Sequence, residues 1–299
     1  MNLNQELNAI MESFLRELYQ DRTSDEETLG IIKVDKRERK DANTDYFDYV
    51  LFIILSDWFS EWEIKHYEYD GEKVAMHLVT EKQLKEWLLN MSNRRVVDWL
   101  MNGSIVFDRN EYLKNFRSEM NHFPEEERLL KTGVEFSKLI RRYTDGKTLF
   151  YSGDYLDAYN HIVHALHHLA RLSVIEHGFY PEITVWQQVK EIEPEIHKLY
   201  SELIAGSEPL NKRLELLMIA NEFEVSRKTS LGSRHLLELM KSREGAWTIQ
   251  ELKEQVAIGE YSLDLGIMIE FLVDKGIVDI QKEETKGKQI YHRYYVYEN

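Results

Sequence analysis

A dense group of basic residues lies in the N-terminal third of the chain. Five cations fall within eight positions: Lys33, Lys36, Arg37, Arg39 and Lys40. Lysine and arginine bind phosphates and carboxylates through charge-assisted hydrogen bonds, so this group could hold an anionic ligand without a metal ion. The alternative is a hydrated charged loop, because residues 35–45 contain no apolar residue except Ala42.

A second group consists of the histidines His161, His164 and His168, with His167 beside them. Positions i, i+3 and i+7 project from one face of a helix, so these imidazoles could bind zinc or another transition metal, or titrate near neutral pH. However, the three side chains are spread over about 10 Å of helix axis, so one metal ion would need ligands from a second helix. The alternative is that they line a pocket or form hydrogen bonds between helices.

A third group lies at the C-terminus, where Lys286, Lys288 and Arg293 alternate with tyrosines and could contact nucleic acid. Charge opposes duplex binding, because residues 234–299 carry nine Lys or Arg against twelve Asp or Glu. The helix predicted over Glu260 to Lys275, which would read the duplex, is itself acidic. We therefore expect no DNA partner, and consider a protein partner the better match for this end.

The first two groups are positioned by different kinds of element. Strands are predicted by runs rich in Ile, Val, Phe and Tyr, whereas capped 3.6-residue periods predict helices around them. The expected strands are Gly30–Val34, Phe47–Leu55, Trp62–Tyr69, Lys73–Val79 and Ile105–Phe107. Helices and strands in this order predict one mixed-sheet α/β domain over residues 1–118.

Helical periods then dominate residues 119–230, which predicts a helical bundle. The expected helices include Asp154–Glu176, Ile183–Lys190, Pro194–Ile204 and Pro209–Asn221. Over residues 231–299, helices at Arg234–Ser242, Thr248–Val256 and Glu260–Lys275 precede two strands, Ile277–Lys282 and Gln289–Tyr297. Three helices followed by a hairpin predict a winged helix. The fold class is thus α+β with three domains.

Composition restricts the possible functions. The chain has 299 residues, no cysteine and a formal net charge of −15. The absence of cysteine excludes disulfides and thiolate chemistry and fits a reducing compartment, so we expect a cytoplasmic protein. Its longest apolar run, Tyr49 to Leu55, is far shorter than the roughly 20 residues that cross a bilayer, so no membrane is expected. The negative charge repels polynucleotides at long range.

Two segments carry a resemblance to known proteins. Gly30-Ile-Ile-Lys-Val, a polar loop and Tyr46-Phe-Asp-Tyr-Val-Leu51 follow one another as in the nucleotidyltransferase fold of the DNA polymerase beta type, and Gly103-Ser-Ile-Val-Phe-Asp-Arg109 extends the likeness. The whole chain resembles a bacterial family described as nucleotidyltransferase-like, which has its own helical and helix-turn-helix domains. The helical domain of related aminoglycoside-type members binds substrate, which makes its acids candidates for a cationic ligand: Glu191, Glu193, Glu195 and Glu202.

The resemblance implies a metal-dependent active site that this chain has largely lost. Active members have a Gly-Ser pair, an Asp-x-Asp and a third carboxylate, because two magnesium ions need several oxygen ligands. In this sequence Asp48 occupies the position of the second Asp. Tyr46 occupies the position of the first Asp, and His77 occupies the position of the third carboxylate. Asp35-Lys36 stands where the Gly-Ser pair is expected. Phenol and imidazole are poor magnesium ligands, although Asp45 could reach the same metal if the loop bulged there.

These observations predict a degenerate nucleotidyltransferase-like protein that binds a nucleotide or another small anionic metabolite in a cleft between its first two domains. The residues expected to hold the ligand are Lys33, Lys36, Arg37, Arg39 and His77. One alternative is an active transferase that uses Asp48, Asp45 and magnesium to modify a small molecule or protein. Another is a transcription regulator that senses a ligand and contacts DNA through its winged end. No cofactor can be named from the sequence itself.

Overall fold

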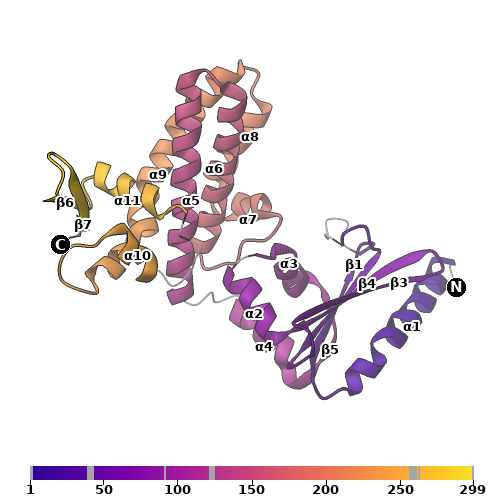
Figure 1. The fold of residues 1–299 in the computed structure, drawn as a ribbon. Coiled ribbons are helices and arrows are strands. Elements are labelled where there is room, and N and C mark those ends of the chain that lie inside the picture. The colour runs from indigo at the N-terminus through magenta and orange to yellow at the C-terminus, as the bar shows by residue number, and fades with distance from the viewer. Residues whose placement is uncertain are drawn as a thin grey trace. The chain divides into compact units, whose positions relative to one another are not determined.

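The computed structural model describes residues 3–38, 44–90, 92–120, 125–255, 261 and 263–297. These residues form two compact units (Figure 1). The first comprises Met1–His122 and Tyr180–Ile183, and the second comprises Phe123–Phe179 and Thr184–Asn299. No helix in the described residues is both long enough and apolar enough to span a bilayer.

The first unit is built on a mixed five-stranded sheet with the strand order β3-β4-β2-β1-β5. Only the β2–β4 pair is parallel. The strands are β1 (Thr28–Asp35), β2 (Tyr49–Leu55), β3 (Trp62–Tyr69), β4 (Glu72–Thr80) and β5 (Ser104–Asp108). Every residue of β2 is buried, because its continuous apolar run suits a strand that is covered on both faces. By contrast, β3 alternates between exposed and half-buried residues, as expected of an edge strand.

Helices cover both faces of this sheet. On one face α1 (Leu3–Ser24) inserts Met11 and Leu15 against the odd-numbered residues of β2. On the other face lie α2 (Glu81–Asn90), α3 (Arg94–Asn102), the short helix η1 (Arg109–Glu111) and α4 (Tyr112–Met120). Trp99 of α3 packs there edge-on against Phe52 of β2. The sheet therefore separates two cores, and residues of one strand can serve different sites.

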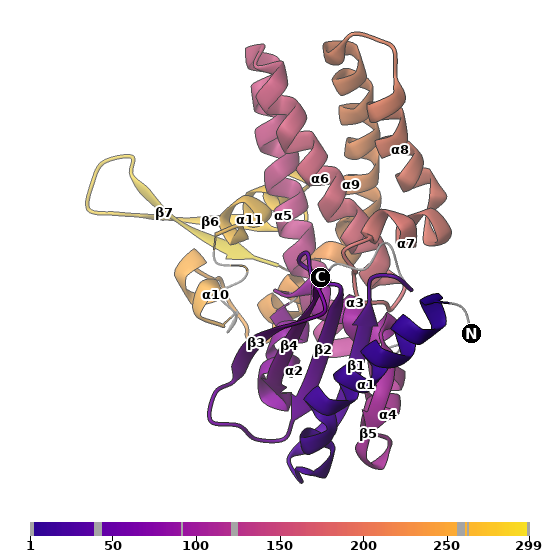
Figure 2. The same cartoon turned by 90° about the vertical axis from the view of Figure 1, so that its right-hand side faces the viewer.

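The second unit contains a bundle of long helices (Figure 2). Its members are α5 (Glu125–Ser152), α6 (Tyr155–Glu176), α7 (Val185–Ile192), α8 (Pro194–Ala205) and α9 (Leu210–Lys241). Helices α5 and α9 approach closely at Gly232, where an added Cβ would lie 2.1 Å from the Phe136 ring. This close contact explains a glycine in the interior of a helix, where it is otherwise unfavourable.

The C-terminal part of the second unit consists of α10 (Ile249–Gln255), α11 (Leu265–Asp274) and the hairpin β6 (Asp279–Glu284) and β7 (Tyr291–Val296). An isolated bridge between Trp247 and Tyr295 joins the hairpin to the segment before α10. Helices followed by a two-stranded wing form the predicted winged helix. In Figure 2 the hairpin projects as a long ribbon.

The predicted fold class is confirmed, and two predicted helices need correction. Residues 234–242 do not form a separate helix, because α9 continues without interruption from Leu210 to Lys241. The helix predicted over 260–275 begins at Leu265 and ends at Asp274, while Glu260 lies outside the described residues. Gly232 is accommodated inside α9, so the prediction of a separate helix was wrong.

Candidate functional site in the first unit

Asp48 lies at the start of β2 and is half-buried. Its Oδ2 accepts a hydrogen bond of 2.9 Å from the backbone N–H of Lys73, at the start of β4. The backbone of Asp48 bonds Lys73 as well, and its carbonyl accepts from the N–H of Lys36. The carboxylate therefore fastens the end of the β2–β4 pair, and one of its oxygens is occupied by that backbone contact.

Asp45 is held by a different element. It is exposed and forms an ion pair with Arg95 on α3. Asp45 and Tyr46 both have positive φ angles, 51° and 71°, which is uncommon for residues other than glycine and places them in a tight turn. Within the described part of the first unit, no three carboxylate or imidazole groups converge as metal ligands, and neither Asp45 nor Asp48 belongs to such a group.

His77 is buried on β4, where the resemblance implies a carboxylate. The Nε1–H of Trp62 donates a hydrogen bond of 3.3 Å to Nδ1 of His77, and the His77 ring contacts Trp99 at 5.0 Å between centroids. Burial lowers the pKa of His77 to about 4, and the charge of His66 acts in the same direction. A neutral imidazole that accepts a hydrogen bond at Nδ1 carries its proton on Nε2. It is a poor ligand for magnesium.

Beside His77 lies an open hollow of about 530 Å³. Its walls are Trp62, Trp87, Ser92, Asn93, Arg94, Arg95 and Ile183. The rings of Trp62 and Trp87 meet edge to face at 5.0 Å, and Asn93 begins α3, so the N-terminus of that helix faces the same region. Aromatic faces, two guanidinium groups and a helix N-terminus are the groups that bind a flat ring carrying negative charge.

The sheet separates the predicted basic cluster from His77. Lys33 is buried on the α1 side, where its Nζ lies 2.5 Å from Oε1 of Glu12 and 3.7 Å from Glu38. Burial alone would lower the pKa of Lys33, but these carboxylates raise it, so the ammonium stays charged. His77 lies on the opposite face, beside Trp99. The expectation that Lys33 and His77 share one site is therefore wrong, since alternate residues of a strand point to opposite faces.

The remaining members of that cluster are exposed or undescribed. Arg37 forms an ion pair with Glu72 and lies over the Tyr49 ring, on the same side as Lys33. Lys36 is exposed. Arg39 and Lys40 lie outside the described residues. Two of the three described cations therefore have carboxylate partners within the chain, which reduces the net positive charge available to a ligand.

Charged groups in the second unit

The three histidines of α6 are not brought together on one metal. Nδ1 of His168 lies 2.7 Å from Glu135 of α5, and Arg171 lies 2.9 Å from the same Glu135 oxygen. Burial raises the pKa of Glu135, but the charges of Arg171 and His168 outweigh it and hold that pKa well below its usual range. His161 lies 3.7 Å from Asp145, and His164 is exposed. His161 and His168 thus form separate contacts with α5, one of the alternatives left open above.

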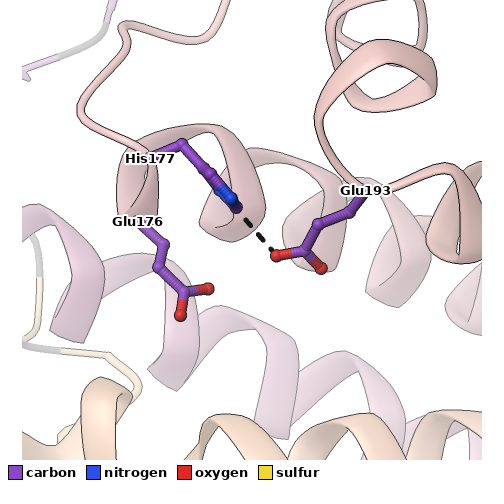
Figure 3. Close-up of side chains that lie close together, drawn as sticks. All are labelled: Glu176, His177 and Glu193. Carbon is purple, nitrogen blue, oxygen red and sulfur yellow. Dashed lines mark ion pairs between the residues drawn. The ribbon is translucent and has the colours of Figure 1, made fainter.

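One group of possible metal ligands does occur in the described residues. Glu176, His177 and Glu193 each place a ligand atom within 4.8 Å of the other two (Figure 3). Glu176 ends α6, whereas Glu193 lies between α7 and α8. Nδ1 of His177 lies 3.9 Å from Oε1 of Glu193 and donates to the carbonyl oxygen of Ser173 at 2.8 Å.

A buried cation already occupies this group. Lys228 of α9 is 2% exposed, and its Nζ contacts Glu176 and lies 2.8 Å from Oε1 of Glu193. Arg227 pairs with the other oxygen of Glu193 at 3.0 Å. Burial opposes ionisation of Glu193, but these two cations lower its pKa. The group is therefore a salt-bridge network in which an ammonium takes the position that a metal ion would need.

The three cations of the winged end that the sequence singled out differ in exposure and pairing. Arg293 pairs with Glu270 of α11 at 2.8 Å and lies over the Tyr295 ring. Lys286 and Lys288 are exposed in the turn between β6 and β7. Within α11 itself, Glu270 and Asp274 are the charged residues. The described part of this helix thus has the acidic character predicted from the sequence.

Comparison with known proteins

The mixed sheet, the helical bundle and the winged end define a nucleotidyltransferase-like protein. Family models match all three parts: Nucleotidyltransferase-like over residues 11–128, YgxA-like substrate binding domain over 129–228 and Helix-turn-helix domain over 234–297. The chain is 47% identical to protein YgxA of Bacillus subtilis (strain 168) over 285 residues, which cover 95% of this chain and 97% of YgxA. It therefore belongs to the family of nucleotidyltransferase-like proteins that includes YgxA.

A solved structure is similar over the same extent. The nucleotidyltransferase-like protein of Exiguobacterium sibiricum 255-15 is 41% identical, with a TM-score of 0.72 over 96% of this chain and 99% of that protein. The family was predicted correctly from the sequence, but the grouping of Trp62, Trp87, Arg94 and Arg95 was not. The adjacent pair Arg94 and Arg95 was the available signal.

Proposed function

We propose that this protein binds a nucleotide or another small anionic metabolite in its first unit and does not transfer a nucleotidyl group. The observation that carries the proposal is that both aspartates, Asp45 and Asp48, are engaged in contacts with other parts of the chain. Asp48 bonds the Lys73 amide and Asp45 pairs with Arg95, while His77 is buried and neutral. Two-metal chemistry needs several carboxylate oxygens at one point, and these three residues serve other contacts.

We place the ligand in the hollow beside His77. A purine or pyrimidine ring would contact Trp62 and Trp87, since base–aromatic stacking is worth about 1–3 kcal/mol. The phosphate or carboxylate would bind Arg95, Arg94 and the N-terminus of α3. Asp45 would then be exchanged for the ligand as the partner of Arg95. This site replaces the predicted group of Lys33, Lys36, Arg37, Arg39 and His77, and the cleft expected between the first two domains stays a prediction.

Two further observations support the proposal. The bundle matches a model described as substrate binding, which suits a protein that recognises a small molecule. The chain contains no cysteine, which is compatible with the reducing cytoplasm where nucleotides are abundant. Cytoplasmic location is accordingly part of this proposal.

Thermal unfolding of the full chain with a panel of nucleotides and other small anions, with and without magnesium, tests the proposal. A true ligand should stabilise the protein by about 2.7 kcal/mol at 100 times its dissociation constant, as mass action requires. We expect the shift to be similar in the presence and absence of magnesium. The absence of a shift with every anion in the panel would remove the proposal.

A transfer assay separates binding from catalysis. We expect no transfer of label from radiolabelled ATP to the protein or to small-molecule acceptors, with either magnesium or manganese. Transfer that Asp48→Asn abolishes would instead establish the active enzyme. Lys114→Gln is a suitable control, because Lys114 is an exposed cation on α4 that pairs only locally with Glu111.

A further inference from the structure

The outward face of α9 carries an exposed apolar stripe. Leu216, Ile219 and Phe223 are 64%, 65% and 67% exposed. Their spacing of three and four residues places them in one line along the helix. The opposite face of α9 is buried in the bundle through Leu214, Met218 and other residues. The stripe is therefore additional to the face that holds the bundle together, and monomeric proteins seldom expose such a line of large apolar side chains.

The charges beside the stripe follow a heptad pattern. With Leu216 and Phe223 at a positions, Ile219 is at d. Glu215 and Glu222 then occupy g positions, and the residues at e are Arg213, Ala220 and Arg227. In coiled coils, residues at g and e flank the apolar seam and determine partner and orientation. Glu222 and Arg227 are both substantially exposed.

These charges distinguish the two possible orientations of a symmetric pair. In a parallel pair, Glu222 at g faces Arg227 at e of the second copy, which is attractive. In an antiparallel pair, a positions face d positions, so g residues face g residues and e residues face e residues of the second copy; depending on the register, Glu215 faces Glu222 or Arg213 faces Arg227. Both of these contacts join like charges. Within its own chain Arg227 also contacts Glu193 and Glu224, so a second Glu222 would join an existing ion-pair group.

We propose that the α9 stripe is the contact surface for a second copy of this chain, with the two α9 helices parallel. Three large apolar residues per copy cover less than the roughly 800 Å² per partner of a standard interface. The dimer is therefore weak and depends on concentration, with a dissociation constant on the order of micromolar. This inference does not depend on whether the first unit binds a ligand.

Sedimentation velocity of the full chain from about 1 to about 100 µM, a range that spans such a dissociation constant, tests the association. The wild-type protein should shift from monomer to dimer across this range, whereas Ile219→Glu and Phe223→Glu should remain monomeric. Leu156→Glu is the control, because Leu156 on α6 is even more exposed, at 78%, and lies outside the stripe. Circular dichroism should show all three variants folded, since the altered side chains are on the surface. A wild-type protein that stays monomeric, or a dimer that survives both stripe variants, overturns the proposal.

Cross-linking tests the orientation, and the natural chain has no cysteine to interfere. In a parallel pair Phe223 lies beside Phe223 of the second copy, so Phe223→Cys alone should form a covalent dimer under mild oxidation. In an antiparallel pair it would face the d position Ile219 instead. A covalent dimer that forms only when Ile219→Cys protein is mixed with Phe223→Cys or Leu216→Cys protein would refute the parallel arrangement. Leu156→Cys should remain monomeric in either case.

Discussion

Nζ of Lys228 lies 2.8 Å from Oε1 of Glu193 in the interior of the second unit, joining α9 to the segment between α7 and α8. Glu176 at the end of α6 contacts the same ammonium. One cation therefore connects three parts of the bundle that are far apart in the sequence. Charges removed from water are stable only when their partners are in place, so this contact makes those parts interdependent.

Replacing Lys228 by methionine should lower the free energy of unfolding by about 3–5 kcal/mol, because it leaves two carboxylates without their shared cation. Urea unfolding measures the change. Lys212→Met is the matched control: Lys212 pairs with Glu215 on the exposed surface of the same helix, where such pairs contribute at most about 1 kcal/mol. A loss in Lys228→Met no larger than in the control would show that the network contributes little.

The same variant should bind divalent metal. Glu176, Glu193 and His177 remain close together once the ammonium is removed, and carboxylates with imidazole are zinc ligands. We expect zinc to restore part of the stability lost in Lys228→Met and to leave the wild-type protein unchanged. Calorimetric titration with zinc measures this directly, and equal binding by both proteins would contradict the interpretation that Lys228 excludes the metal.

Burial of His77 should make stability depend on pH. The folded-state pKa of about 4 lies below the value of 6.5 for an unperturbed histidine, so between these values the unfolded chain binds a proton that the folded chain does not. This contribution to stability is complete above pH 6.5 and is lost as the pH falls toward 4, by about 3 kcal/mol in total. Urea unfolding at pH 7.5 and pH 5 should show a smaller difference in His77→Gln than in wild type. His292→Gln, an exposed histidine of the wing, should retain the wild-type difference.

Arg95 should matter for binding more than for folding. Its ion pair with Asp45 is partly exposed, so Arg95→Gln should change the free energy of unfolding by less than about 1 kcal/mol. Loss of a charged hydrogen bond to an anionic ligand should weaken binding by about 10- to 100-fold. Isothermal titration with the best ligand from the nucleotide panel measures this, with Lys114→Gln as the control. Unchanged affinity in Arg95→Gln would place the ligand elsewhere.

The winged end should not bind duplex DNA, even at low salt. Its described helix α11 is acidic, and Arg293 is paired with Glu270. Electrophoretic mobility shifts at about 50 mM salt, where phosphate contacts are strongest, provide the measurement. Binding that falls with salt and disappears when Lys286 and Lys288 are both changed to Glu would instead establish the regulator considered from the sequence.

Local patterns in the sequence predicted individual elements well. Strand β3 has the predicted bounds of Trp62 and Tyr69, because its alternation and the following Asp70-Gly71 turn are both short-range signals. Helix α6 ends at Glu176, as predicted, and Gly178 with its positive φ follows. The length of α9 was not predicted, since Gly232 reads as a weak point in isolation. Gly232 is needed inside the helix because the Phe136 side chain of α5 packs against it, and Phe136 is almost a hundred residues away in the sequence.

The site was predicted less completely, because its contacts are long-range. The sequence identified Asp45, Asp48 and His77, but each is bound to a residue on another element: Arg95, Lys73 and Trp62. No spacing rule indicates that Lys33 and His77 lie on opposite faces of a sheet whose order is only known once it is folded. The residue types could therefore suggest metal or anion binding, whereas the contacts between charged groups determine which of these residues are available for it.

The uninterrupted course of α9 links the bundle to the winged end mechanically. A straight helix of 32 residues is about 48 Å long. It belongs to both the substrate-binding match and the start of the helix-turn-helix match. If α9 moves as a rigid lever, a tilt of about 5° at its Leu210 end displaces its Lys241 end by about 4 Å. A displacement of the bundle at the Leu210 end of α9 would thus move the wing without a hinge in between.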